Sequence, residues 1–163
     1  MLKSLASHGF PPLFDEHSTI LILGSFPSVA SRESSFFYMH PRNRFWPVLA
    51  KVYQEETPIG VEERKSFCLR HELALYDAIE SCAIHGSSDA SISDVVPADL
   101  SPIYEETKIQ KILLNGKTAE RYFKLYQKDT HGLPIFTLPS TSAANAAWSL
   151  DRLAEAWRQA LLI

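Results

Sequence analysis

Cysteine, long apolar runs and an excess of positive charge are scarce in this sequence. Only two of its 163 residues are cysteines, and Cys68 and Cys82 have neither the spacing of a metal-binding pair nor the number needed for a disulfide framework. The six histidines are scattered without the spacing of metal ligands. We therefore expect no metal site, and nothing in the sequence indicates a cofactor.

No apolar stretch approaches the length needed to cross a membrane, and the first residues are not followed by the apolar core of a signal peptide. A cytoplasmic protein without membrane contact is the expectation. The apolar fraction of 45% and the charged fraction of 21% are typical of soluble globular proteins. This length predicts one domain over residues 1–163, and we expect a monomer.

The net charge of −3 argues only weakly against a nucleic-acid partner, because it sums over the whole chain. A local basic patch decides the affinity for phosphate, and His40, Arg42 and Arg44 lie close enough in the sequence to form one. The patch is small. Any affinity for DNA should therefore be modest and should fall as salt is raised.

Short apolar runs alternate with helical patterns, which predicts an α/β fold with a parallel sheet and helices on both of its faces. Strands are expected at residues 19–23, 73–76, 111–114 and 134–138. Helices are expected at residues 47–53, 61–71, 118–126 and about 144–162, with a short helix from Ser101. The stretches 1–18, 24–39 and 83–100 are predicted to be a surface lead-in, a structured loop without helix, and a polar surface excursion.

The carboxyl ends of parallel strands meet at one edge of a sheet, which is where open α/β folds bind their ligands. Four groups of residues are expected to converge there: Gly24, Ser25 and Phe26; Asp77; Asn115 and Gly116; and Pro139 and Ser140. This edge is the predicted place for a site.

Arginines, an amide, a histidine and aromatic rings crowd into residues 38–46, just after the first predicted strand and its loop. Guanidinium and amide groups supply directed hydrogen bonds, and aromatic rings supply stacking faces. The mixture suits a planar, polar, phosphate-bearing ligand. Asn43 is either a helix cap or an amide that holds a water through its oxygen, and Arg42 and Arg44 are either part of the site or plain solvated charges.

The other candidate residues also have two interpretations. Residues 24–28, which include Pro27, form either a tight turn or a backbone platform with Phe26 as a stacking ring. Asp77 and Asn115 are either caps and turn residues or groups that hydrogen-bond the edge of a base. Residues 139–146 place serines before the last predicted helix, where free backbone N–H groups make an anion site, although Ser142 alone would explain a simple cap.

Two separated motifs, residues 24–28 (GSFPS) with 40–46 (HPRNRFW) and residues 138–146 (LPSTSAANA), together resemble a known family. They look like the hypoxanthine-DNA glycosylase branch of the uracil-DNA glycosylase superfamily. Residues 75–82 and 86–89 are also similar to its pattern, so the likeness runs from about residue 20 to the last helix. Ala143 departs from it, because family members are expected to have proline there.

The resemblance implies a three-layer α/β/α sandwich around a four-stranded parallel sheet. It implies excision of a deaminated base, hypoxanthine above all, from a DNA partner, leaving an abasic site. By motif position Asn43 would be the catalytic residue, and residues 24–26 would line the base pocket with Phe26 stacked on the base. The loop with Ser140, Thr141, Ser142 and Asn145 would bind phosphates and enter the minor groove.

A base inside a duplex cannot be attacked, so such an enzyme must flip the nucleotide out. An amide is a poor proton acceptor, and the expected role of Asn43 is to position water. No lysine stands among the motif residues, which predicts hydrolysis without a Schiff base or strand cleavage. The alternatives are a uracil- or mismatch-specific glycosylase and a non-catalytic DNA-binding module. A small-molecule hydrolase would need a nucleophile with its base or a glycine-rich phosphate loop, and neither spacing is present.

Overall fold

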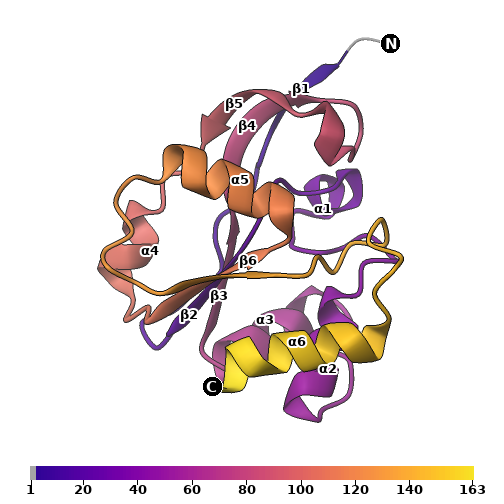
Figure 1. Cartoon of the computed structure of the whole chain (residues 1–163), viewed down its shortest axis with the longest axis vertical. Helices are drawn as coiled ribbons and strands as arrows, with labels where there is room; N and C mark the ends of the chain where they lie inside the picture. The colour runs from indigo at the N-terminus through magenta and orange to yellow at the C-terminus, as the bar shows by residue number, and fades with distance from the viewer. Residues whose placement is uncertain (1–2) are drawn as a thin grey trace.

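Four parallel strands form the central sheet in a computed structural model that describes residues 3–163 (Figure 1). Their order across the sheet is β3-β2-β6-β7. The bounds are Ile20–Gly24 for β2, Leu73–Asp77 for β3, Lys111–Asn115 for β6 and Ile135–Leu138 for β7. Each strand lies within one residue of its predicted bounds, and the predicted parallel sheet is confirmed.

Helices cover both faces of this sheet, as predicted. Figure 1 shows α5 on one side and α2, α3 and α6 on the other. Their bounds are Phe45–Tyr53 for α2, Val61–Arg70 for α3, Ser101–Glu106 for the short α4, Lys117–Tyr126 for α5 and Leu150–Leu162 for α6. The central strands β2 and β6 therefore bury apolar residues on both faces, including Leu21, Ile22 and Leu113, which have no exposed surface. None of the helices within residues 3–163 is long and apolar enough to cross a membrane.

A second, antiparallel sheet was not predicted. Its strands are β1 (Ser4–Ser7), β4 (Ile79–Ile84) and β5 (Ser93–Pro97), in the order β1-β4-β5. The surface lead-in predicted over residues 1–18 thus contains a strand at residues 4–7, which is largely exposed, and residues 1 and 2 lie outside the described part of the chain. The surface excursion predicted over 83–100 likewise contains the largely exposed β5, because β4 follows β3 after the single residue Ala78 and pairs with both β1 and β5.

Two helix predictions also need correction. The loop 24–39 contains a short helix, α1 (Val29–Ser34), whose first turn is capped by the Ser28 hydroxyl accepting from the Ser31 backbone N–H at 3.2 Å. The last helix begins at Leu150 and not near residue 144, because Ser149 is its cap and accepts from the Arg152 N–H at 3.2 Å. Residues 139–148 are therefore a loop, and the helix N-terminus that was expected directly after Ser142 is not there.

Candidate active site

A cavity of about 450 Å³ opens at the carboxyl ends of β2, β3 and β6. That volume lies within the range of small-molecule and cofactor sites. Eleven of the candidate residues line it: Gly24, Ser25, Phe26, Pro27, His40, Asn43, Asp77, Asn115, Ser140, Thr141 and Ser142. Arg42, Arg44 and Asn145 are not among the lining residues. The structure thus brings segments far apart in the sequence to one hollow, while the roles of the individual residues stay predictions.

A chain of side-chain hydrogen bonds crosses the floor of the cavity. Asn115 at the end of β6 binds the fully buried Thr141 twice, through Nδ2 to Oγ1 at 3.0 Å and through Oδ1 to the Thr141 backbone N–H at 3.1 Å. The Thr141 hydroxyl then donates to Oδ1 of Asn43 at 2.9 Å. The two motif loops are therefore joined through Thr141, which fixes the position of Asn43 relative to the sheet.

The side-chain oxygen of Asn43 accepts two hydrogen bonds from within the protein. It accepts from the Phe45 backbone N–H at 2.9 Å as well as from Thr141. Because a backbone N–H can only donate, the atom facing it must be oxygen, and this fixes the orientation of the amide. Nδ2 of Asn43 has no hydrogen-bond partner within residues 3–163, so the group left for a ligand is an N–H donor and not the oxygen that the sequence argument assigned to water.

Arg44 supports the loop between β7 and α6 from inside the protein. Its guanidinium donates to the backbone oxygens of Ser142 at 3.1 Å, Asn145 at 3.0 Å and Trp148. Its backbone N–H donates to the Thr141 oxygen at 3.0 Å, and Asn145 itself donates to the Ser140 oxygen at 3.0 Å. Both Arg44 and Asn145, predicted to bind DNA, thus have internal hydrogen bonds, whereas Arg42 is exposed.

Because Gly24 has no side chain, β2, β3 and the segment that carries Tyr38 approach one another closely beside the cavity. A Cβ on Gly24 would overlap Oδ1 of Asp77 and would stand 3.1 Å from the Tyr38 hydroxyl. Tyr38 is held by stacking on Phe45, with ring centroids 3.8 Å apart, and its hydroxyl is buried without a hydrogen-bond partner among the described residues. Burial raises the pKa of Tyr38, and the negative charge of Asp77 adds to this, so the hydroxyl stays a donor.

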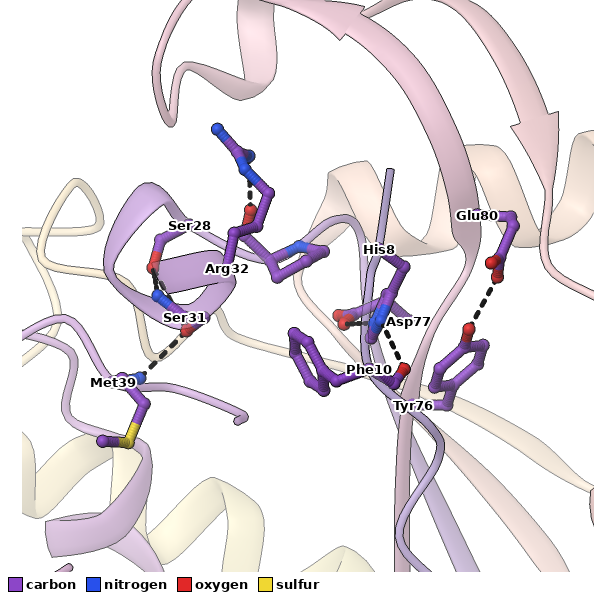
Figure 2. A network of polar contacts seen from close by, with 10 residues as sticks. His8, Phe10, Ser28, Ser31, Arg32, Met39, Tyr76, Asp77 and Glu80 are labelled. Carbon is purple, nitrogen blue, oxygen red and sulfur yellow. Dashed lines mark hydrogen bonds and ion pairs between the residues drawn. The ribbon is translucent and has the colours of Figure 1, made fainter. Parts of the chain in front are cut away.

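Asp77 is tied to His8, as Figure 2 shows. Nε2 of His8 lies 2.7 Å from Oδ2 of Asp77, and Nδ1 lies 3.0 Å from the Phe10 backbone oxygen. The His8 side chain has no exposed surface and that of Asp77 is 6% exposed. The sequence argument missed His8 because residues 1–18 carry no recognisable pattern, and only the pairing of β1 with β4 brings His8 beside the strand end.

The outer rim of the cavity is formed partly by residues that sequence reasoning also missed. Residues 87–90, with the short 3₁₀ helix Asp89–Ser91, line it. The Ser25 hydroxyl donates to the Asp89 carboxylate at 3.2 Å. Desolvation raises the pKa of Asp89, and Asp77 contributes to the same effect. The mouth of the cavity thus holds a second carboxyl group near Asp77, which the composition of a polar loop could not reveal.

Phe26 and Ser140 both line the cavity. Phe26 packs in a small apolar cluster with residues such as Ile79 and Cys82, and the Arg32 guanidinium lies 5.2 Å from its ring centroid. Ser140 approaches Gly116 so closely that a Cβ on this glycine would come within 2.9 Å of the Ser140 Cβ.

Among residues 3–163, no group of three or more His, Cys, Asp and Glu side chains is arranged to hold a metal ion.

Comparison with known proteins finds similarity over nearly the whole chain. Residues 11–161 match the model of the uracil DNA glycosylase superfamily. A hypoxanthine DNA glycosylase of Methanosarcina acetivorans is 33% identical over 153 residues, which cover 93% of this chain and 96% of that protein. A hypoxanthine DNA glycosylase of Methanosarcina barkeri is 29% identical over 163 residues, covering 96% and 98%.

A solved structure has the same fold. The solution NMR structure of a candidate uracil DNA glycosylase from Methanosarcina acetivorans superposes with a TM-score of 0.80 at 31% sequence identity. The match covers 99% of this chain and 97% of that one. The overall fold is therefore shared over nearly the whole length of both proteins.

Proposed function

This chain belongs to the uracil DNA glycosylase superfamily, and we propose that it is a DNA repair glycosylase that flips a deaminated base out of DNA and hydrolyses its N-glycosidic bond. Hypoxanthine is the preferred base, in keeping with the two relatives that carry its name. The observation that carries the proposal is the single cavity into which both sequence motifs and Asp77 project. We further propose that the protein acts as a cytoplasmic monomer.

The cavity suits an everted nucleotide. A base within a duplex is inaccessible, so the enzyme must rotate the nucleotide into a pocket before it can act. The lining of the hollow of about 450 Å³ includes Phe26 and the loop of Ser140. Phe26 would contact the face of the base, while the strand ends would contact its edge. Exposed Arg42 and the backbone of residues 140–144 would meet the flanking DNA.

Cleavage of the bond builds positive charge on the sugar and negative charge on the departing base. Preorganised donors near the base stabilise that negative charge, and DNA phosphates stabilise the cation. Asn43 presents an N–H donor into the cavity, and its oxygen is held by Thr141 and Phe45. We therefore place Asn43 as a donor that contacts the reacting nucleotide, with water entering from the open side.

The residues that line the cavity include no lysine. A Schiff-base route needs a lysine or a comparable amine at the sugar. The proposed reaction is accordingly hydrolysis by water alone, which leaves an abasic site and an intact strand.

A labelled duplex with one modified base tests the proposal. The protein is incubated with duplexes that carry hypoxanthine, uracil, xanthine or a thymine mispair, and each is then treated with alkali to cut at abasic sites. Strand cutting after alkali, and not before it, with hypoxanthine as the best substrate is expected. Release of uracil alone would overturn the substrate assignment. Salt-dependent DNA binding without any abasic product would instead identify a non-catalytic binding module.

A further inference from the structure

His8 lies between two oxygen atoms inside the protein, and this fixes how many protons the pair with Asp77 holds. Nδ1 faces the Phe10 backbone oxygen at 3.0 Å, and because a carbonyl only accepts, Nδ1 carries a proton. Nε2 faces Oδ2 of Asp77 at 2.7 Å, so another proton lies between these two atoms. The pair is therefore either an imidazolium with a carboxylate or a neutral imidazole with a carboxylic acid.

The surroundings of His8 favour the imidazolium. Its ring packs against three aromatic rings, with centroids at 4.2 Å to Phe10, 4.3 Å to Tyr76 and 5.9 Å to Phe37. Aromatic faces attract a cation, and the 2.7 Å separation from Asp77 is typical of a charge-assisted hydrogen bond. The backbone N–H of His8 donates to the backbone oxygen of Glu80 at 2.7 Å, which fixes the position of the residue.

The other titratable groups near Asp77 form no ion pair with it among residues 3–163. On the cavity side stand the Tyr38 hydroxyl, which stays protonated, Asp89 at the rim, and His40, which lines the same cavity. On the β4 side, Glu80 accepts from the Tyr76 hydroxyl at 2.6 Å. Among the described residues, His8 is therefore the group that pairs with the Asp77 charge.

Oδ1 of Asp77 is left for the cavity. It has no hydrogen-bond partner within residues 3–163, and it stands over the Cα of Gly24, beside the Tyr38 hydroxyl. An ionised carboxylate only accepts hydrogen bonds, whereas the Tyr38 hydroxyl can donate one. An acceptor and a donor thus lie next to each other where the edge of a flipped base would lie.

Deamination reverses the hydrogen-bonding character of two adjacent groups on the edge of a base. It turns the amino group of adenine or cytosine into a carbonyl oxygen, and it turns the neighbouring bare ring nitrogen into an N–H. A carboxylate accepts the new N–H but faces a lone pair when the base is undamaged. A site built to bond an N–H rejects the analogue without it strongly, by about 10⁴-fold. Guanine carries the same N–H, so the shape of the cavity and not this pair must exclude its additional amino group.

We propose that His8 is a positioning residue that keeps Asp77 ionised, so that Oδ1 accepts the ring N–H created by deamination while Tyr38 donates to the new carbonyl oxygen. The inference rests on the proposed function and deepens it. A buried ion pair contributes little net stability, and here it fixes the hydrogen-bonding character of one atom in the cavity.

Nitrogen NMR of ¹⁵N-histidine-labelled protein tests the protonation state directly. The His8 signals are assigned by their loss in His8→Gln, and His17, whose side chain is 74% exposed, is the reference for an exposed ring. Both His8 nitrogens are expected to be protonated at neutral pH. A bare Nε2 on His8 at neutral pH would overturn the inference, whatever the glycosylase assay gives.

A pH profile separates positioning from simple structural support. In His8→Gln, Asp77 lacks its cation, and burial then favours its protonated form. Hypoxanthine release at neutral pH should fall by about 100-fold and should recover as the pH is raised, while the wild type and His17→Gln stay level. An equal loss of hypoxanthine release at every pH would contradict the positioning role of His8. If wild-type protein releases no base at all, the proposed function fails, and the NMR result still stands by itself.

Discussion

The Thr141 hydroxyl donates a 2.9 Å hydrogen bond to Oδ1 of Asn43, two residues that are 98 positions apart in the chain. Thr141 belongs to the loop after β7, and Asn43 precedes α2. This bond and the two between Thr141 and Asn115 join both loops to the end of β6. The position of the candidate catalytic amide is therefore set by the central sheet through one buried hydroxyl.

Replacing that hydroxyl should destabilise the protein and slow the reaction. Thr141→Val keeps the shape but removes the bond that Asn43 Oδ1 accepts from the hydroxyl and leaves Nδ2 of Asn115 without its acceptor. The cost of an unsatisfied buried polar group is about 1–3 kcal/mol of unfolding free energy, measured by urea denaturation. Thr57→Val is the matched control, because Thr57 is exposed and its hydroxyl makes no hydrogen bond within residues 3–163, so the change should cost less than about 0.5 kcal/mol. Equal stability of the two variants would show that the buried chain of bonds contributes nothing.

Asn43 should matter for the chemistry. Asn43→Ala is expected to reduce the single-turnover rate of base release by at least about tens-fold, the scale of losing one positioned polar group. Near-normal turnover would move the role to Asp77 or to another residue.

Asn43→Asp distinguishes a donor from an acceptor. An aspartate can still accept from Thr141 and Phe45, but its second oxygen faces the cavity as an acceptor in place of the N–H. If Asn43 acts as a donor, Asn43→Asp should be as slow as Asn43→Ala in the same single-turnover assay. Retention of most of the wild-type rate by Asn43→Asp would show that the residue orients water through an oxygen.

The two arginines of the first motif should behave differently. Arg42→Ala removes an exposed charge and should weaken DNA binding in all sequences, reducing the salt dependence of the binding constant by about one counterion. Arg44→Ala removes the bonds to three loop carbonyls and should reduce the unfolding free energy by about 2 kcal/mol. Fluorescence anisotropy at several salt concentrations and urea denaturation measure the two effects. If both variants changed DNA binding and unfolding free energy in the same way, the different roles given to Arg42 and Arg44 would be contradicted.

Gly24→Ala should disable the cavity without straining the backbone. Gly24 is not among the glycines with positive φ, so alanine fits the strand itself. The added Cβ would displace Oδ1 of Asp77 and crowd the Tyr38 hydroxyl. Base release should fall by about 100-fold, while DNA binding through the exposed surface changes little. Normal release by a folded Gly24→Ala protein would show that the base does not contact this corner.

The central sheet could be predicted from the sequence because its strands are short apolar runs closed by glycine, proline or polar residues. The meeting of Gly24, Asp77 and Asn115 follows from the parallel order of these strands. Outside the central sheet, sequence patterns predicted less of the structure. Residues 143–147 favour helix by composition, yet Arg44 binds the loop carbonyls of Ser142 and Asn145 and holds this stretch outside the helix.

His8 could not be found from local sequence. It stands between a polar strand, Ser4–Ser7, and a proline-rich segment, and neither has an apolar period. Its importance comes from Asp77, 69 residues away, and from the register in which Ser7 pairs with Ser81. The same holds for Asp89, which reaches the cavity because the segment between β4 and β5 lines part of it. Contacts of this kind depend on tertiary structure and leave no local periodicity.

Mass spectrometry of the base released from a deoxyinosine-containing duplex tests the central claim most directly, with wild-type protein and Asn43→Ala compared in single-turnover reactions. Wild-type protein should release free hypoxanthine in step with abasic sites on an uncut strand, and Asn43→Ala should release it at least about tens-fold more slowly. No hypoxanthine from folded, DNA-binding wild-type protein, or equal release by both proteins, would contradict the account.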